Sequence, residues 1–226
     1  MRLAIVVPTL NEEGTLRRNL PRAVAQADEV VVTDGGSTDA TVDVARALGA
    51  RAICGPPGRG GQLNRGAAAT DADVILFLHA DTILPDNAGQ AVREAVAAGA
   101  PGGAFLLRFD GEGFVYRLGE TVVNLRTKRA FLPLGDQAQW ITRDAFRELG
   151  GFREWPILED LDLSRRMRAR WGRRRLAVIE ERVVTSARRF AAHGPARTVA
   201  RNWMIWALFR LGVSPNRLAK LYRDVR

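Results

Sequence analysis

Residues 3–39 read LAIVVPTLNEEGTLRRNLPRAVAQADEVVVTDGGSTD, and this stretch decides the fold. Leu3–Val7 is a short apolar run that ends at a proline, which is typical of a buried strand. Asn11 is expected to cap a helix over Glu12–Gln26, and Glu29–Thr33 is a second apolar run. A strand, a helix and a further strand in this order predict a βαβ unit with parallel strands.

The same alternation continues as far as residue 109. Three more strands are expected, at Arg51–Cys54, Val74–Leu78 and Gly103–Phe109. Helices are expected between them, at Thr38–Leu48 with Ser37 as its cap, Gln62–Thr70 and Asn87–Ala98. We therefore predict an α/β fold with a mainly parallel central sheet, in which ligands bind beyond the carboxyl ends of the strands.

The second half of the chain is less regular. Two strands are expected, at Leu176–Ile179 and Val183–Ser186. Helices are expected at Phe114–Thr127, Asp144–Leu149, Asp160–Trp171, Pro195–Leu211 and Pro215–Val225. This pattern predicts one α/β domain over residues 1–194, followed by an amphipathic helical extension over residues 195–226.

Composition limits the classes of protein to consider. With 226 residues and 46% hydrophobic side chains, the chain is long enough to bury a sizeable core. Cys54 is the only cysteine, which excludes an intramolecular disulfide and a cysteine-rich zinc site. The longest uncharged run, Ala95–Leu107, is far shorter than the roughly 20 residues of a membrane-spanning helix. The first apolar run is too short for a signal peptide, so a cytoplasmic location is expected.

The net charge of +9 is unevenly distributed. Residues 1–142 carry a net charge of −2 and residues 143–226 a net charge of +11. This asymmetry suggests an anionic partner for the C-terminal third, such as nucleic acid, lipid headgroups or a phosphorylated substrate; a solvated basic surface is the alternative. Residues 197–220 add an apolar helix with basic flanks, which is consistent with peripheral contact at the inner face of a membrane. Core packing or dimerisation, as in a homodimer, is the more common use of such a helix.

Polar residues follow the first two strands. Pro8, Asn11 and Glu12 follow the first strand, and the segment Asp34-Gly35-Gly36-Ser37-Thr38-Asp39 follows the second. Glycines such as Gly36 let the backbone approach a ligand, and Ser37 would begin a helix whose free N–H groups face an anion. Asp34 could accept hydrogen bonds from a base or a ribose. An ordinary turn with a helix cap is the alternative.

His79-Ala80-Asp81 follows the fourth strand. Both the imidazole and the carboxylate could ligate one divalent cation that bridges a diphosphate. Oxygen ligands and retained water suit Mg²⁺ or Mn²⁺. The alternative is that Asp81 caps the next segment and His79 only forms a hydrogen bond.

Other candidate residues lie further along the chain. Glu159 and Asp160 begin a helix whose dipole stabilises an ionised carboxylate, and such a carboxylate can take a proton from a hydroxyl nucleophile. Acidic residues in a first helical turn are also common for structural reasons. The glycine-rich segment 58–66 is not a P-loop, but its polar side chains could contact phosphate or ribose, namely Arg59 and Asn64. Near residue 190, two adjacent arginines could neutralise a leaving diphosphate and a histidine could add a metal ligand, or all three could face solvent; these are Arg188, Arg189 and His193.

Taken together, these motifs resemble family 2 glycosyltransferases of the GT-A fold, over about residues 2–170. The matching segments are Val6–Glu12, Asp34–Asp39 as the D-D-G-S-T-D element, Asn64–Ala67 as N-x-G-x, His79–Asp81 as D-x-D, and the Glu159-Asp160 pair. Two positions depart from the family pattern, because Gly35 and His79 stand where the family has aspartates. The segments Leu78–Thr82 and Gly135–Gln137 resemble a small bacterial subgroup that is linked by name to arsenosugar biosynthesis.

The resemblance implies metal-dependent transfer of a sugar from a UDP- or GDP-sugar to an acceptor hydroxyl, with inversion. Asp34 and the neighbours of Asn11 would hold the nucleoside, and Asp81 would hold Mg²⁺ or Mn²⁺ on the diphosphate. Asp160 would be the base. Further contacts to the diphosphate, the donor sugar or the acceptor are implied for Arg188, Arg189, Asp136 and Gln137. The acceptor is left open between a small molecule and a lipid phosphate.

Two other functions compete with this reading. A nucleotidyltransferase would need a glycine-rich loop with Arg or Lys directly after the first strand, where this chain has Pro8–Glu13. A nucleic-acid-binding protein could use the basic C-terminal third, but it would not explain carboxylates at successive strand ends. We therefore expect a glycosyltransferase with no nucleic-acid partner.

Overall fold

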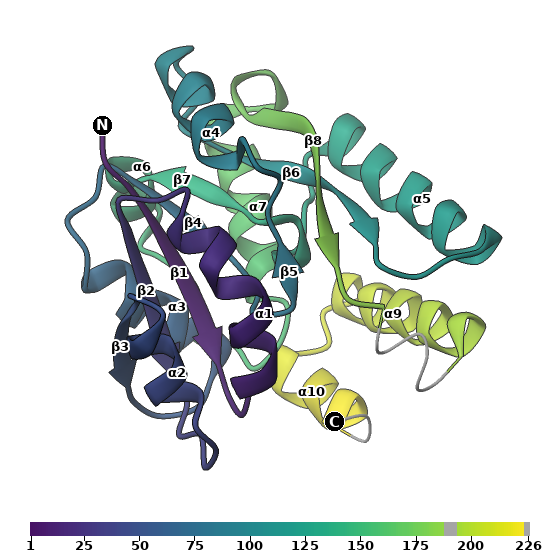
Figure 1. Ribbon diagram of the computed structural model, residues 1–226. Coiled ribbons are helices and arrows are strands. Elements are labelled where there is room, and N and C mark those ends of the chain that lie inside the picture. Colours follow the sequence, from purple (N-terminus) through teal and green to yellow (C-terminus); the bar gives the residue numbers. More distant parts are fainter. Residues whose placement is uncertain (188–193, 224–226) are drawn as a thin grey trace.

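The computed structural model describes residues 1–187 and 194–223, and within them eight strands form one sheet (Figure 1). The strand order is β3-β2-β1-β4-β7-β6-β8-β5. The strands are β1 Leu3–Thr9, β2 Glu29–Asp34, β3 Arg51–Cys54, β4 Val74–Phe77, β5 Thr82–Ile83, β6 Gly102–Phe109, β7 Trp140–Thr142 and β8 Ala177–Thr185. Neighbours among β1 to β4 are parallel, as are β6 and β8, whereas β7 runs antiparallel between β4 and β6. The predicted α/β fold with a mainly parallel sheet is confirmed.

Helices cover both faces of this sheet (Figure 1). The helices are α1 Glu13–Val24, α2 Thr41–Ala47, α3 Arg59–Ala68, α4 Ala88–Ala97, α5 Phe114–Ala130, α6 Arg143–Leu149, α7 Glu159–Trp171, α9 Pro195–Arg210 and α10 Pro215–Arg223. Two short 3-10 turns complete the described elements, η1 Gly135–Gln137 and η2 Arg173–Arg175. Connections by helices are what parallel strands require, because a tight turn cannot join two parallel strands.

The core has two layers, one on each face of the sheet. Successive side chains of a strand point to opposite faces. In β1, Ile5 packs with Leu16 and Leu20 of α1, while Val6 packs on the other face with Leu63 of α3. The apolar runs of β1, β2 and β4 are therefore buried on both sides, which is why they lack the alternation of a half-exposed strand.

Several expected boundaries were wrong. The first helix begins at Glu13 without a side-chain cap, because Asn11 adopts a left-handed conformation with φ 54° and turns to the next loop. The second helix begins at Thr41, so Ser37 is not its cap. The two strands expected near the end of the domain are one strand, β8, with an irregularity opposite Phe105.

The C-terminal helices pack onto the domain, with α10 toward the end of the molecule where β1 and β2 finish (Figure 1). The ring of Phe209 in α9 meets Trp155 edge-on at 5.9 Å and lies 5.6 Å from the guanidinium of Arg165. Ile205 and Leu218 are buried, so part of the apolar surface of residues 197–220 is used in packing. The division at residue 194 stays a prediction. No helix in the described part of the chain combines the length and apolar character needed to span a membrane.

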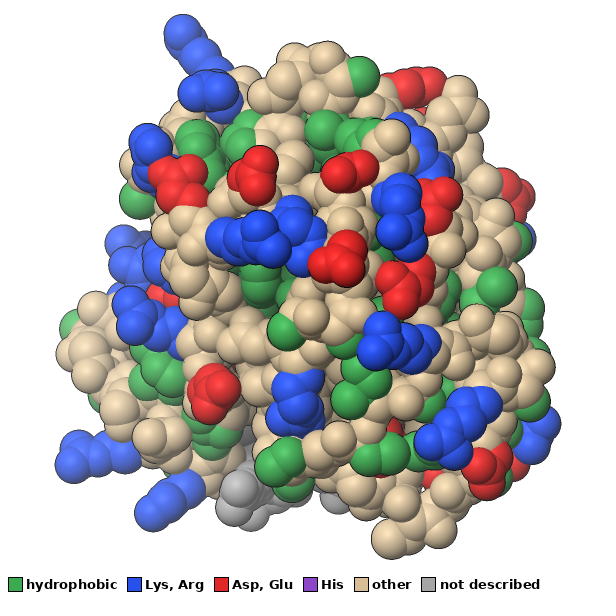
Figure 2. Space-filling model, turned by 90° about the vertical axis from the view of Figure 1, so that its left-hand side faces the viewer, with side chains coloured by type: hydrophobic (Ala, Val, Ile, Leu, Met, Phe, Trp, Pro, Cys, Tyr) green, Lys and Arg blue, Asp and Glu red, His purple; other side chains and the backbone are tan. Residues whose placement is uncertain are grey.

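Basic and acidic side chains are interspersed over the face at the β3 edge of the sheet (Figure 2). Ion pairs such as Arg51–Glu29, with 3.8 Å between charged atoms, belong to this edge. Opposite charges in alternation are typical of an ordinary solvated surface.

Candidate active site

The loops after β1 and β2 are held together by Asp34. This buried carboxylate accepts hydrogen bonds at Oδ2 from the backbone N–H groups of Gly36, at 2.8 Å, and Ser37, at 2.7 Å. Its Oδ1 accepts from Thr9 Oγ1, at 3.2 Å, and from the Ser37 hydroxyl. Burial alone would raise the pKa of Asp34, but these hydrogen bonds outweigh it and lower the pKa. Asp34 therefore shapes the loop, and the predicted contact with a base or ribose would have to replace one of these bonds.

Asn11 joins the two loops from the other side. Its Oδ1 accepts a hydrogen bond from the Thr38 N–H at 2.8 Å, and its own N–H donates to Ser37 Oγ at 2.8 Å. Pro8 and Glu12 are half-buried beside it, while Asn11 and Gly36 are exposed. The first two predicted motifs thus form one continuous surface at the carboxyl ends of β1 and β2.

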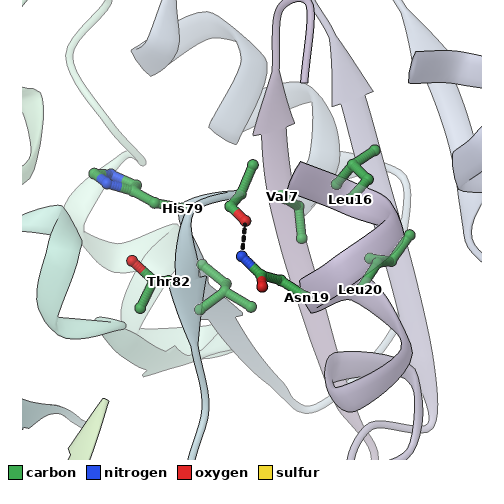
Figure 3. Close-up of a pocket in the computed structure, with 8 residues that line it drawn as sticks. Val7, Leu16, Asn19, Leu20, His79 and Thr82 are labelled. Atoms are coloured by element: carbon green, nitrogen blue, oxygen red, sulfur yellow. Dashed lines mark hydrogen bonds between the residues drawn. The ribbon is translucent and has the colours of Figure 1, made fainter. Parts of the chain in front are cut away.

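The segment His79-Ala80-Asp81 is anchored by its backbone. Asn19 of α1 donates a hydrogen bond to the Ala80 carbonyl at 2.8 Å (Figure 3). The Asp81 carbonyl accepts a hydrogen bond from the Ser186 N–H at 3.2 Å. The His79 side chain points away from α1, as Figure 3 shows. A cavity of about 10 Å³ lies between α1 and this segment, which is room for one water at most.

Three distant segments converge at Gly135 of η1. The Gly135 N–H donates to Asp160 Oδ2 at 2.6 Å. A methyl group on Gly135 would collide with Nε2 of His79 and would lie 3.1 Å from Oδ2 of Asp160. The imidazole after β4 and the carboxylate at the start of α7 therefore flank the same backbone position.

The Asp160 carboxylate is held by backbone donors at both oxygens. Besides the bond to Gly135, its Oδ1 accepts from the Leu161 N–H at 2.6 Å. The buried Gln139 fixes the local backbone by donating to the Asp160 carbonyl at 3.2 Å and to Ser164 Oγ at 2.7 Å. Each carboxylate oxygen keeps a second lone pair, so Asp160 can still accept a proton.

Glu159 lies behind Asp160, with 1% of its surface exposed. Burial and the neighbouring charge of Asp160 raise the pKa of Glu159 to about 7, against the opposing effect of Arg59. The Arg59 Nε lies 3.6 Å from Glu159 Oε1 and so joins the start of α3 to the start of α7. The phosphate contact expected of Arg59 would have to share its guanidinium with this carboxylate.

Two side chains that were predicted to contact a ligand form hydrogen bonds within the protein. Asn64 pairs with the backbone of Phe152, donating at 2.9 Å and accepting at 2.8 Å. Gln137 is fully buried; it accepts from Thr127 Oγ1 at 3.0 Å and donates to the Phe105 carbonyl at 3.1 Å. Because the Gln137 side chain is fully buried, the expectation that it touches donor or acceptor is wrong, whereas the expected contact of the half-buried Asn64 stays a prediction.

Arg126 of α5 is a site residue that the sequence analysis missed. Burial lowers the pKa of Arg126, and the nearby carboxylates of Asp136 and Asp160 oppose that shift. Its Nη2 lies 3.5 Å from Gln137 Oε1. No motif marks Arg126, because only the fold brings α5 beside η1 and α7.

Three predicted site residues belong to the segment between β8 and α9. Arg188, Arg189 and His193 lie outside the described residues. Within the described ranges, no group of three or more His, Cys, Asp or Glu side chains is arranged to hold a metal ion.

Comparison with known proteins identifies the family. Residues 4–153 match the family model described as Glycosyl transferase family 2. The chain belongs to glycosyl transferase family 2. Among curated relatives, glucosyl-3-phosphoglycerate synthase of Mycobacterium tuberculosis is 36% identical over 96 residues, which cover 37% of this chain and 30% of the relative. The O-antigen chain rhamnosyltransferase RfbN of Salmonella typhimurium is 38% identical over 96 residues, covering 38% and 30%. The match thus spans about a third of the length of these relatives.

Several solved structures have the same GT-A fold as this chain. The complex of the M. tuberculosis synthase with phosphoglyceric acid superposes with a TM-score of 0.61 at 22% identity, covering 88% of this chain and 78% of the other. S. aureus TarS gives a TM-score of 0.64 at 16% identity, covering 82% and 60%. A further structure of the synthase contains Mn²⁺, UDP-glucose and phosphoglyceric acid; its TM-score is 0.57 at 24% identity, covering 80% and 70%.

Proposed function

We propose that this chain transfers a sugar from a UDP- or GDP-sugar to an acceptor hydroxyl, with inversion at the anomeric carbon. The observation that carries the proposal is the convergence of His79, Gly135 and Asp160. A carboxylate able to accept a proton thereby lies beside the motif expected to receive the diphosphate. The family membership supports the same reaction class.

The donor would lie along the surface formed by the loops after β1 and β2. Pro8, Asn11 and Glu12 on one loop and Gly36 and Ser37 on the other line this surface. Its position beyond the carboxyl ends of parallel strands is where α/β proteins bind nucleotides.

Asp81 is the residue proposed to hold Mg²⁺ or Mn²⁺, with His79 as an alternative ligand. This motif offers one carboxylate, that of Asp81, and the His79 imidazole. This fits ions that are commonly bound by one or two carboxylates together with substrate phosphates. Such an ion would stabilise the charge on the leaving diphosphate.

Asp160 is proposed as the general base. It takes the proton of the acceptor hydroxyl while that oxygen forms a bond to the anomeric carbon. At the same time the bond from that carbon to the donor's phosphate oxygen breaks, and the nucleoside diphosphate leaves. One displacement inverts the anomeric centre and needs no covalent enzyme nucleophile. Glu159 would support this step indirectly, because its ion pair with Arg59 holds the start of α7 in place.

The acceptor is proposed to be an anionic small molecule or a lipid phosphate. The net charge of +11 on residues 143–226 favours an anionic acceptor. The subgroup linked by name to arsenosugar biosynthesis stays a proposal that rests on Leu78–Thr82 and Gly135–Gln137. A cytoplasmic location with peripheral membrane contact through residues 197–220 likewise stays a proposal.

Release of nucleoside diphosphate from UDP- and GDP-sugars with Mn²⁺ tests the function. We expect release by the wild type and a loss of turnover of two or more orders of magnitude in Asp160→Asn, which keeps the shape of the side chain but lacks its basicity. Donor affinity should change little in this variant. Near-normal turnover of Asp160→Asn would remove Asp160 as the base, and no release from any donor by the wild type would contradict the function.

A further inference from the structure

Helix α5 has its polar and apolar faces reversed relative to a normal surface helix. Its buried side chains toward the sheet are Glu120, Asn124 and Thr127. Five of its large apolar side chains face outward and are 43–79% exposed; they are Phe114, Val115, Leu118, Val122 and Leu125. We call these five residues the α5 stripe. Figure 1 shows α5 at the periphery of the molecule.

The polar inner face is explained by what it covers. Within the described residues, strand β7 pairs with β6 at Gly102 and Gly103, and no strand lies beside the rest of that edge of β6. The Asn124 side chain takes the place of a neighbouring strand. It accepts a hydrogen bond from the Leu107 N–H and donates one to the Leu107 carbonyl, both at 2.9 Å. Glu120 accepts from the Phe109 N–H at 2.9 Å. Helix α5 thus covers this edge of the sheet through hydrogen bonds, and its partly buried Tyr116 and Val123 add apolar contacts to the core.

These hydrogen bonds also fix the rotation of α5. The helix cannot turn its apolar residues inward without breaking the bonds to Leu107 and Phe109, which would leave buried backbone groups unpaired. The α5 stripe therefore stays on the surface. Contiguous exposed apolar patches of this kind mark interaction sites.

The spacing within the stripe fits a helical partner. Val115, Leu118, Val122 and Leu125 follow one another at intervals of three, four and three residues, which is the seam spacing of paired helices. The charges at the two ends of the stripe are opposite, with exposed Glu112 before it and exposed Arg129 after it. Among the residues that the structure describes, neither of these two side chains forms an ion pair.

We propose that the α5 stripe binds the α5 stripe of a second copy of this chain, with the two helices antiparallel. Pairing about the midpoint near residue 120 places Leu118 opposite Val122 of the second copy and Val115 opposite Leu125. The same register brings Glu112 to Arg129. All contacts then occur twice, as a two-fold interface requires.

The charges distinguish this partner from an anionic membrane. Asp110 and Glu112 are both exposed at the start of α5. An anionic lipid surface would attract the exposed Lys128 and Arg129 at the end of α5 but would repel these carboxylates at its start. An antiparallel second copy brings the basic end of α5 to this acidic end instead.

Sedimentation velocity of the full chain tests the proposal. We expect a species of twice the 24.8 kDa chain mass, which Leu118→Asp converts to monomer. The matched control is Leu211→Asp, because Leu211 is 80% exposed but lies outside α5. Circular dichroism should show both variants folded, since neither side chain is buried.

A charge swap sharpens the test. Glu112→Arg and Arg129→Glu should each weaken the dimer at least severalfold, and the double variant should restore it, because the swapped charges again face each other. A monomeric wild type would overturn the proposal, as would a dimer insensitive to Leu118→Asp. Binding of the monomer to anionic phosphatidylserine vesicles through Leu118 would assign the stripe to a membrane instead.

Discussion

At the scale of single residues, Glu159 links the site to the stability of the fold. Its pKa rises from an ordinary value of 4.5 to about 7, because the protein buries it beside Asp160. A carboxyl whose pKa is raised by folding stabilises the native state while it is protonated. That contribution is complete below pH 4.5 and is lost as the pH rises through 7.

We therefore predict that Glu159→Gln is more stable than the wild type at pH 8 and similar to it at pH 5. The difference at pH 8 should approach about 3 kcal/mol, because each pKa unit corresponds to about 1.4 kcal/mol. Urea unfolding at the two pH values measures it. The control is Glu154→Gln, which removes an exposed carboxylate nearby and should show no such pH dependence. Equal stability of Glu159→Gln and wild type at both pH values would contradict the raised pKa.

A substitution at Gly135 tests directly whether catalysis requires His79 and Asp160 to lie close to this residue. The added methyl group of Gly135→Ala would force His79 and Asp160 apart, and a misplacement near 1 Å can cost about 100-fold in rate. We expect turnover to fall by about that factor, measured as nucleoside diphosphate release.

Gly119→Ala is the matched control for this substitution. A methyl group there meets only Phe109 at 3.5 Å, an ordinary contact, so turnover should be unchanged. If Gly135→Ala were as active as Gly119→Ala, the close approach of His79 and Asp160 to Gly135 would not matter for catalysis.

Sequence motifs identified some residues of the proposed site but not others. His79, Asp81 and Asp160 could be proposed from the sequence because they follow apolar runs or begin a helix. Arg126 could not, because nothing in its neighbourhood distinguishes it from the other arginines of the chain. The structural roles of Asn64 and Gln137 depend on the backbone of Phe152 and Phe105, which are remote in sequence.

At the scale of elements, hydrophobic periodicity predicted most of the helices and strands but not always which face of an element packs against the sheet. The buried strands β1, β2 and β4 were recognisable as uninterrupted apolar runs. Strands β5 and β7 were missed, since each has only two or three residues and exists through antiparallel pairing with distant partners. Helix α5 was expected, but its amphipathic pattern would place the wrong face against the sheet.

Asn124 tests whether α5 truly replaces a strand. Asn124→Ala removes both hydrogen bonds to Leu107, and leaving two buried backbone groups unpaired should cost about 2 to 4 kcal/mol of unfolding free energy. Thr121→Ala changes an exposed residue of the same helix and should stay within about 0.5 kcal/mol of the wild type. Chemical denaturation compares the two. A loss in Asn124→Ala no greater than in Thr121→Ala would mean that α5 contributes little to the β6 edge.

At the scale of the whole molecule, the chain joins a predictable half to a less predictable one. The first half follows the βαβ alternation, and its loops meet at one end of the sheet for topological reasons. The second half supplies Asp160 from α7, Gly135 from η1 and Arg126 from α5. Helix α9 then packs against the segment before α7 through Phe209 and Trp155. Sequence reasoning identified the loops that we propose bind the donor, but it could not show which residues would surround the proposed base.

Because both halves build the site, a donor should stabilise the fold as a whole. A ligand at 100 times its dissociation constant adds about 2.7 kcal/mol to the unfolding free energy. We predict that UDP or GDP raises the melting temperature more with Mn²⁺ than with EDTA, as measured by thermal shift. In Asp81→Asn the shift with Mn²⁺ should fall to that seen with EDTA, because the proposed metal ligand is lost. Asp86→Asn, which alters an exposed carboxylate after β5, should keep the full shift. A metal-dependent shift that survives in Asp81→Asn would remove Asp81 as the metal ligand while leaving the donor loops in place.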